Sequence, residues 1–360
     1  MDAGRMAYRI EQIMNEKKLD AIIVTDQYSM RYIASYRGEG VVVYSRTGRY
    51  VITDSRYTEQ VERECPDYQC VDIAGKGYVK CIREALDVCA GKGHIRAGFE
   101  NYSISFRQYA ECSDGLKDVE LVGVDGALDA LREVKTEEEI EKLRTAESIG
   151  DEAFTHILGY LKPGITEREV ALELEYYMKK NGAEGLSFDT IAASGRNSSM
   201  PHAIPTDKKL EDGDFLTMDF GCLYEGYCSD MTRTVAIGHA TDSMRTVYET
   251  VLMAQTESMK MIKAGVPCNE VDAVARRIIA DKGYGNCFGH GLGHSVGLFI
   301  HENPRFSPKC TDVLKTGMVI TVEPGIYLPG QFGVRIEDLV AVTENGFVNL
   351  TSSEKKLIVV

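Results

Sequence analysis

A glycine- and histidine-rich stretch, Gly289 to Glu302, constrains the fold of this chain more than any other segment. It reads GHGLGHSVGLFIHE and places three of the chain's seven histidines within twelve positions. Its glycines allow tight turns and close approach of the backbone to a ligand. Imidazole is a frequent metal ligand and a frequent acid or base. A plain loop with buried histidines is the alternative, but carboxylates at the ends of strand-like segments elsewhere favour a functional site.

Two aspartates lie on strand-like segments that a short turn joins. Residues 215–219 alternate apolar and small side chains and end at Asp219, as a buried strand does. After a turn at 224–226, a second strand predicted over 227–235 carries Asp230. Two buried carboxylates that face each other repel, so one would be protonated unless a cation held both. The alternative is that each aspartate only caps a turn.

Two glutamates occupy similar apolar settings further along the chain. The run Val319–Val322 leads directly into Glu323, and Glu337 stands among valine, isoleucine and leucine. Acidic residues are seldom buried without a partner. For Glu337, a plain ion pair with Arg335 is the alternative explanation.

Together these segments offer four carboxylates and one imidazole, from Asp219, Asp230, His294, Glu323 and Glu337. Such oxygen-rich ligation suits manganese, iron or cobalt better than a structural zinc site. The amount of negative charge predicts two divalent ions, which can share a hydroxide and polarise a carbonyl together. His202 and His301 remain outside this set, and either can donate to substrate or to a developing oxyanion. His202 as a surface-loop histidine and Cys228 as a packing residue are the plainer interpretations.

The order of predicted elements divides the chain. A length of 360 residues exceeds the usual size of one hydrophobic core, so two domains are expected. Up to about residue 125, short strands alternate with helices, which is typical of an α/β layer domain. Long helix pairs follow over 137–182 and 242–283, with capping boxes at Thr136–Glu139 and Thr166–Glu169. We therefore predict domains at residues 1–128 and 129–360, with the chemistry in the second.

Composition excludes several classes of partner. The net charge of −14 argues against nucleic acid and anionic membrane, since both attract basic surfaces. No apolar run approaches the roughly 18–20 residues that span a bilayer, and the N-terminus lacks the apolar core of a signal peptide. The ten cysteines are scattered and include no Cys-x-x-Cys pair. We therefore expect a cytoplasmic protein with reduced thiols.

Several motifs of this chain resemble those of the aminopeptidase P and prolidase group of metallopeptidases. They lie at 217–221 (TMDFG), 227–234 (YCSDMTRT), 290–301, 323–327 (EPGIY) and 334–338 (VRIED). The resemblance covers nearly the whole chain. It implies an α/β (α+β) protein with an N-terminal creatinase-like α/β domain and a C-terminal pita-bread catalytic domain, the fold shared with methionine aminopeptidases and creatinase. It also implies a homodimer.

The resemblance assigns each candidate residue a role. It implies Asp219 as a ligand of one ion, Asp230 and Glu337 as ligands of both, and His294 and Glu323 as ligands of the other. Glu323 would also transfer protons. His202 and His301 would bind substrate and steady the tetrahedral intermediate, while His290 and Arg335 would line the pocket.

We therefore expect an aminopeptidase P-like enzyme that cleaves the bond between an N-terminal residue and proline in peptides. Its cofactors would be two divalent ions per chain, manganese first, with cobalt, iron or zinc as alternatives. An Xaa-Pro bond is a tertiary amide without an N–H, so proteases that hold their substrate by that group fail on it. A strict Xaa-Pro dipeptidase is the first alternative. A creatinase-like hydrolase needs no metal, and a binding protein on the same fold would be expected to lose ligands, whereas all five are present.

Overall fold

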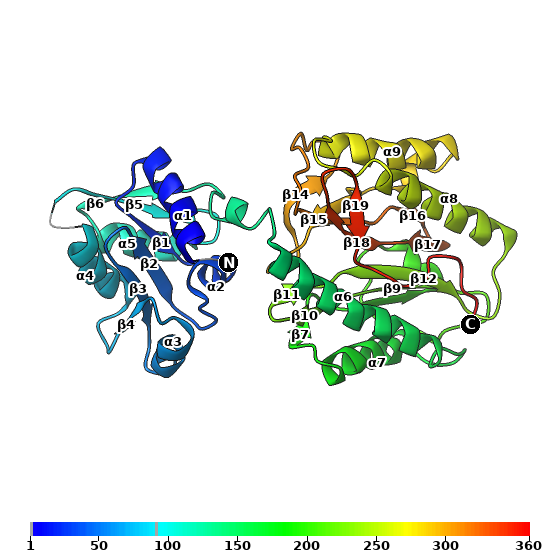
Figure 1. The fold of residues 1–360 in the computed structure, drawn as a ribbon. Helices are drawn as coiled ribbons and strands as arrows, with labels where there is room; N and C mark the ends of the chain where they lie inside the picture. The colour runs from blue at the N-terminus through cyan, green and yellow to red at the C-terminus, as the bar shows by residue number, and fades with distance from the viewer. Residues whose placement is uncertain (1–2, 91–92) are drawn as a thin grey trace. The chain divides into compact units, whose positions relative to one another are not determined.

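The computed structural model describes residues 3–90 and 93–360 and divides into two compact units, Met1–Arg132 and Glu133–Val360 (Figure 1). The elements of the first unit are α1 (Ala3–Lys17), β1 (Ala21–Val24), α2 (Gln27–Ala34), β2 (Val41–Ser45), β3 (Arg49–Thr53), α3 (Thr58–Glu64), β4 (Gln69–Asp72), α4 (Tyr78–Ala90), β5 (Ile95–Phe99), α5 (Phe106–Gly115), β6 (Val119–Gly123) and a 3₁₀ turn at Asp129–Leu131.

A single mixed sheet organises the first unit, with strand order β4-β3-β2-β1-β5-β6. Strand β1 runs parallel to β5 and antiparallel to β2. Its residues Ile22 and Val24 pack with α1 and α2, whereas Ala21 and Ile23 pack with α4 on the other face. A strand covered on both faces is apolar throughout, which explains its uninterrupted run. The sheet with helices on both faces confirms the predicted α/β layer domain.

Helix α2 is an element that the sequence analysis missed. Asp26 caps it, because its carboxylate accepts hydrogen bonds from the N–H groups of Tyr28 at 3.0 Å and Ser29 at 2.9 Å. The helix spans only Gln27–Ala34. So short a segment shows little periodicity, and its single aspartate cap was the available signal.

The second unit is larger and contains all remaining elements. They are α6 (Glu137–Leu158), α7 (Glu167–Lys180), β7 (Gly185–Leu186), β8 (Ile191–Ser194), β9 (Phe215–Phe220), β10 (Cys222–Tyr224), β11 (Tyr227–Cys228), β12 (Met231–Ala236), α8 (Asp242–Met259), α9 (Cys268–Asp281), β13 (Gly293–Ser295), β14 (Glu302–Phe306), β15 (Val319–Val322), β16 (Gly325–Leu328), β17 (Phe332–Arg335), β18 (Asp338–Val342) and β19 (Phe347–Asn349), with 3₁₀ turns at Gly195–Ser199 and Gly285–Cys287.

Helices cover two sides of a central group of sheets in this unit, α6 and α7 on one side and α8 and α9 on the other (Figure 1). The larger sheets have the strand orders β12-β9-β8 and β14-β13-β15-β18-β19. Both predicted capping boxes are present: Thr136 with Glu139 begins α6, and Thr166 with Glu169 begins α7. Two buried clusters, one under each helix pair, form the core.

Alternation along β9 explains how an acidic residue reaches the middle of this unit. Leu216, Met218 and Phe220 pack into the cluster beneath α6 and α7. Neighbouring side chains of a strand point to opposite faces, so Thr217 and Asp219 point the other way. The fold therefore directs Asp219 away from the apolar core and towards the interior space that the sheets enclose.

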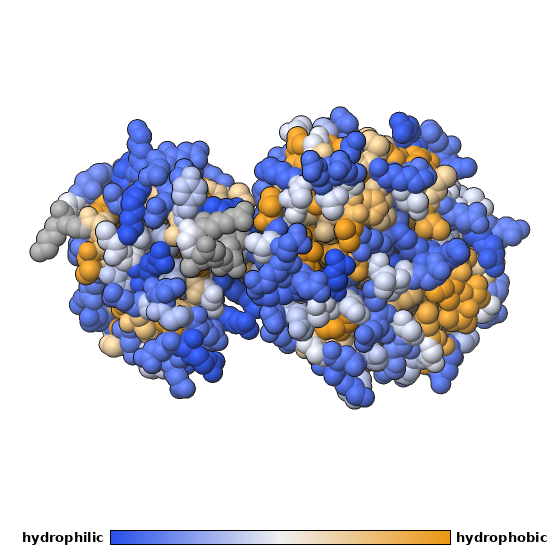
Figure 2. All heavy atoms as spheres, in the orientation of Figure 1, coloured by the Kyte–Doolittle hydropathy of each residue, from blue (hydrophilic) through white to orange (hydrophobic). Residues whose placement is uncertain are grey.

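Hydrophilic residues predominate over the face of each unit seen in Figure 2, with scattered apolar areas between them. Within the described residues, every helix is too short or too polar to cross a membrane.

Candidate metal centre

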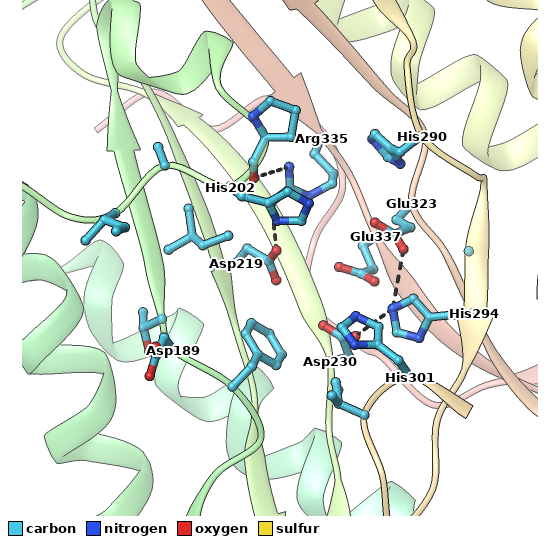
Figure 3. A pocket seen from close by; sticks show the side chains of 18 of the residues that line it. Asp189, His202, Asp219, Asp230, His290, His294, His301, Glu323, Arg335 and Glu337 are labelled. Atoms are coloured by element: carbon cyan, nitrogen blue, oxygen red, sulfur yellow. Dashed lines mark hydrogen bonds and ion pairs between the residues drawn. The ribbon is translucent and has the colours of Figure 1, made fainter. Parts of the chain in front are cut away.

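One cavity of about 760 Å³ in the second unit brings together every site residue predicted from the sequence (Figure 3). Its walls include His202, Asp219, Asp230, His290, His294, His301, Glu323, Arg335 and Glu337. These residues come from segments up to 135 positions apart (Glu337 minus His202). The cavity is therefore built by tertiary folding and not by one local motif.

Asp219 and Asp230 reach the cavity by different routes. Asp219 lies on β9, opposite Thr232 of β12 in an antiparallel pair. The strand predicted over 227–235 is interrupted, and this expectation was wrong: β11 ends at Cys228, β12 begins at Met231, and Asp230 lies in the break. The Asp230 N–H group donates to Glu147 Oε2 at 3.2 Å instead of to a strand partner. The break thus turns the buried Asp230 carboxylate into the cavity.

Cys228 lies beside this break but is not on the cavity wall. Its Sγ lies 3.8 Å from the carbonyl oxygen of Leu298, and its side chain is buried. This contact agrees with its interpretation as a packing residue.

The other proposed ligands lie at strand ends. His294 is on β13, Glu323 follows β15, and Glu337 separates β17 from β18. The Nε2 atom of His294 lies 3.5 Å from Asp230 Oδ2 and 3.5 Å from Glu323 Oε1. One ligand atom each from Asp230, His294 and Glu337 lies within 4.8 Å of the others. Such a spacing lets all three groups reach one ion.

The hydrogen bonding of His294 leaves one ring nitrogen for a metal. Its Nδ1 lies 3.2 Å from the carbonyl oxygen of Ser295, which can only accept, so Nδ1 carries the proton. Burial, together with the nearby charge of His301, lowers the pKa of His294 to about 3, so the ring is neutral. The Nε2 lone pair then faces carboxylate oxygens. This arrangement is repulsive without a cation and is the one that metal-binding histidines adopt.

Among the described residues, the carboxylates of Asp230, Glu323 and Glu337 form no ion pair with a lysine or an arginine. Desolvation and the charge of Glu337 raise the pKa of Asp230 well above its usual value, and desolvation and Glu323 do the same for Glu337. Desolvation raises the pKa of Glu323 to about 8. The buried Oδ1 of Asp219 has no hydrogen-bond partner among residues 3–90 and 93–360. Unmet negative charge and an unpaired oxygen are what a divalent cation would satisfy, so these residues fit one.

Arg335 does not form the ion pair that the sequence offered as a plain explanation for Glu337. Its Nη2 lies 2.7 Å from Asp219 Oδ2, and its Nη1 donates to the hydroxyl of Tyr327 at 2.8 Å. Glu337 instead accepts a hydrogen bond of 2.6 Å from the Thr232 hydroxyl. Arg335 therefore orients Asp219 and leaves Glu337 without a cationic partner in the described chain.

His290 lies on the cavity wall with both ring nitrogens already engaged. Its Nδ1 lies 2.8 Å from the carbonyl oxygen of Gly291, and its Nε2 lies 2.9 Å from the Tyr327 hydroxyl. Burial and the charge of Arg335 lower its pKa to about 4. Tyr327 thus links His290 to Arg335. Sequence reasoning missed Tyr327, because a tyrosine two residues after a Pro-Gly turn carries no sign of its partners.

His202 and His301 are exposed on the cavity wall, in keeping with groups that meet a substrate. The His301 ring packs edge-on against that of His294, with centroids 4.5 Å apart. Burial and the charge of Arg305 lower the pKa of His301. The His202 ring makes no hydrogen bond within the described part of the chain. Both therefore keep polar nitrogens free for a ligand.

Arg305 is a further cavity residue that the sequence analysis missed. It lies on β14 directly opposite His294 of β13, and cross-strand partners place their side chains on the same face. Its side chain forms no hydrogen bond or ion pair with residues 3–90 and 93–360. The register of β13 and β14, which brings Arg305 to the site, is not visible in the sequence.

Each of the two units matches the model of a known protein family. Residues 141–344 match the model of metallopeptidase family M24, and residues 7–134 match that of the creatinase/prolidase N-terminal domain. The chain is 43% identical over 360 residues to an Xaa-Pro dipeptidase from Pyrococcus furiosus, covering 98% of this chain and 100% of that one.

Solved structures show the same similarity. An Xaa-Pro dipeptidase from Bacillus anthracis superposes with a TM-score of 0.96 at 41% identity, over 100% of both chains. An X-Pro aminopeptidase from Thermotoga maritima MSB8 superposes with a TM-score of 0.91 at 38% identity, over 98% of this chain and 99% of that one. Each similarity therefore spans both units.

Proposed function

Because this chain belongs to metallopeptidase family M24, we propose that it is a metal-dependent dipeptidase that cleaves the bond between an N-terminal residue and a C-terminal proline. The sequence analysis favoured an aminopeptidase P-like activity and kept the dipeptidase as its alternative. The similarity to proteins named Xaa-Pro dipeptidase, over nearly the full length of both chains, supports the alternative instead. A structure named X-Pro aminopeptidase is also similar, so the distinction needs a structural argument.

The observation that carries the dipeptidase proposal is the free cation of Arg305. A dipeptide ending in proline presents a carboxylate one residue beyond the scissile bond, whereas a longer peptide presents an amide there. Arg305 lines the same cavity as the proposed metal ligands and has no acidic partner in the described chain. A guanidinium matches the geometry of a carboxylate, which it can bind through two hydrogen bonds. Binding of the substrate's terminal carboxylate to Arg305 would therefore select dipeptides.

We propose that the cavity holds two divalent ions, manganese first, through Asp219, Asp230, His294, Glu323 and Glu337. Ions bound there would polarise the scissile carbonyl and lower the pKa of a bound water. The protein orients the ligands through hydrogen bonds, with Arg335 on Asp219 and Thr232 on Glu337. The hydroxyl of Thr321 lies 3.4 Å from Glu323 Oε1.

Proton transfer is assigned to the proposed ligand Glu323, and substrate orientation to residues around the ligands. Glu323 lines the cavity among the proposed ligands, where its carboxylate can take a proton from a bound water and pass it to the leaving proline nitrogen. His202 and His301 can donate to the substrate carbonyl oxygen as negative charge develops on it. His290, whose nitrogens are occupied, presents a ring that can pack against the proline side chain.

A hydrolysis panel tests the dipeptidase proposal. Purified protein supplied with Mn²⁺ would be assayed on an Xaa-Pro dipeptide, its C-terminal amide and an Xaa-Pro-Xaa tripeptide. Hydrogen bonds to a charged group contribute about 1.5–3 kcal/mol, so kcat/KM should fall roughly 10- to 100-fold when the carboxylate is masked. Arg305→Met should reduce kcat/KM for the dipeptide by a similar factor and change the amide much less.

Arg168→Met is the matched control, because Arg168 also lines the cavity but is already paired with Asp207 at 3.0 Å. It should leave the preference for dipeptides intact. Equal kcat/KM for the dipeptide and the tripeptide, with no selective effect of Arg305→Met, would contradict the dipeptidase proposal. That result would favour the aminopeptidase P-like activity instead.

A further inference from the structure

A second buried polar network lies directly behind the proposed metal ligands, and Arg233 is its centre. Arg233 is on β12, three residues after Asp230, and only 1% of its surface is exposed. Its neighbour Thr232 faces the cavity side, where its hydroxyl contacts Glu337 and Arg335. Because side chains alternate along a strand, Arg233 points away from the cavity. It does not line the catalytic cavity.

The guanidinium of Arg233 has acceptors for all of its nitrogens. Nη1 donates to the carbonyl oxygen of Thr232 at 3.0 Å and also to that of Glu337. Nη2 donates to Asp338 Oδ1 at 2.8 Å and to the carbonyl oxygen of Ser353 at 2.8 Å. Nε donates to the carbonyl oxygen of Glu354 at 3.1 Å. These hydrogen bonds and the burial of the side chain hold the Arg233 guanidinium in a single position.

This bonding ties together two chain segments that each carry a proposed ligand. Asp230 precedes Thr232 on one segment, and Glu337 is on the other. The Glu337 N–H group donates to the Thr232 carbonyl oxygen at 3.1 Å, and Arg233 Nη1 bonds that same carbonyl together with the carbonyl of Glu337. The separation of the two segments is therefore set at the backbone, at Glu337 itself and two residues after Asp230.

Acidic and basic groups on the far side hold Arg233 itself in place. Asp338 is fully buried, and besides Arg233 it binds Lys355 Nζ at 2.5 Å and Asn349 Nδ2 at 3.0 Å. Its charge is thus balanced by two cations. The anchors of Arg233 on this side are Asp338 of β18 and the carbonyl oxygens of Ser353 and Glu354, none of which lines the cavity that contains the proposed ligands.

We propose that Arg233 is a positioning residue that fixes the spacing of Asp230 and Glu337 and thereby sets the metal affinity of the site. Metal sites require their ligands in a narrow geometry, and partners of the ligands commonly change metal affinity 10- to 100-fold when they are replaced. The inference rests on the proposed ligand set. It adds a residue that touches neither metal nor substrate.

The test is a calorimetric titration of metal-free protein with Mn²⁺ alone. Arg233→Lys keeps the positive charge but has three donors on one nitrogen, so it cannot bond the five acceptors that the guanidinium reaches. We expect a folded variant that binds Mn²⁺ on the order of 10- to 100-fold more weakly than the unaltered protein. Asp338→Asn is the second variant, which keeps the side-chain shape but removes the negative charge that binds the Arg233 guanidinium. It should weaken Mn²⁺ binding by a smaller factor.

Tyr248→Phe provides the matched control. The Tyr248 hydroxyl donates to the Lys355 carbonyl oxygen at 2.9 Å, so its loss loosens the same segment without touching a ligand-bearing one. This control should lower the melting temperature of the metal-free protein and leave Mn²⁺ affinity within about threefold of the original.

The possible outcomes separate the inference from the proposal on which it rests. Unchanged Mn²⁺ affinity in folded Arg233→Lys overturns the inference, and unchanged affinity in Asp338→Asn does so if Arg233→Lys fails to fold. Absence of Mn²⁺ binding by the unaltered protein would contradict the proposed ligand set and this inference with it.

Discussion

Glu337 and Asp338 are neighbours in the chain, yet they belong to two buried networks of opposite character. Asp338 lies in the network behind the ligands, where Arg233 and Lys355 both bind it. Although burial acts in the other direction, these cations hold the pKa of Asp338 below its usual value. Glu337 lies on the cavity side, where burial and Glu323 raise its pKa instead. One residue along the chain separates a balanced charge from an unbalanced one.

The difference distinguishes carboxylates that hold the fold from carboxylates that serve its chemistry. A buried acidic side chain that is paired with cations already has its charge balanced and needs no metal ion, and loss of its partner destabilises the fold. A buried group of acids without counter-charges costs free energy until a cation binds. Perturbed pKa values therefore mark a site only when the perturbing partners are like charges or burial, as they are around Glu337. Substitutions in the two networks should therefore have different effects.

The largest effect is expected at Glu323, on the cavity side. Glu323→Gln keeps the side-chain shape and an oxygen atom for the proposed ion but removes the proposed proton-transfer group. Turnover should fall by about 10²- to 10⁴-fold, the range for loss of a general acid or base, and more than substrate affinity does. Steady-state kinetics with metal analysis of the same sample measure both quantities. Near-normal turnover with full metal content would assign proton transfer to another group.

His202→Ala and His301→Ala should have the next largest effect, because both side chains line the cavity outside the proposed ligands. Loss of one donor to a developing oxyanion costs roughly 2.7–4 kcal/mol, or about 10²- to 10³-fold in turnover. Metal content should stay unchanged. His294→Ala is the comparison, since removal of a ligand should lower Mn²⁺ affinity first. A His202→Ala protein with full metal and full turnover would make His202 a plain loop histidine.

Asp151→Ala should give the smallest effect on turnover and the clearest effect on stability, because Asp151 binds Ser352 and Ser353 and not Arg233 or a proposed ligand. The Asp151 carboxylate accepts hydrogen bonds from the N–H and hydroxyl groups of Ser352 and Ser353, at 2.5–2.8 Å. Its loss should lower the free energy of unfolding by about 2–3 kcal/mol, as expected for hydrogen bonds to a charged group. Urea denaturation and Mn²⁺ titration measure the two responses. Loss of Mn²⁺ binding without loss of stability would contradict a purely structural role for Asp151.

The sequence predicted the layers of the fold because hydrophobic periodicity and capping signals are local. The apolar run of β1 and the capping boxes at Thr136 and Thr166 are examples, and each is present in the structure. The candidate site residues were also visible, because carboxylates at the ends of apolar strands are unusual wherever the strands lie. Their shared position on one cavity wall needed the structure.

The features of the site that the sequence did not predict all depend on contacts between segments that are distant in the chain. The break before Asp230 arises where Glu147 replaces a strand partner for its N–H group. Arg335 forms an ion pair with Asp219, which is 116 positions away in the sequence, and not with its near neighbour Glu337. Arg305 reaches the site through the register of β14 on β13, which includes an irregularity between His294 and Ser295. No spacing rule within the sequence encodes such pairings.

The anchoring of Arg233 on the carbonyls of Ser353 and Glu354 has a consequence for how the protein is made. Translation adds these two residues after every proposed metal ligand and after nearly all of the core. Until they leave the ribosome, Arg233 lacks two of its acceptors and Asp338 lacks Lys355. A nascent chain can therefore build its sheets but cannot complete the support behind Asp230 and Glu337. The support behind the proposed ligands is thus completed only after residues 353–355 have been added.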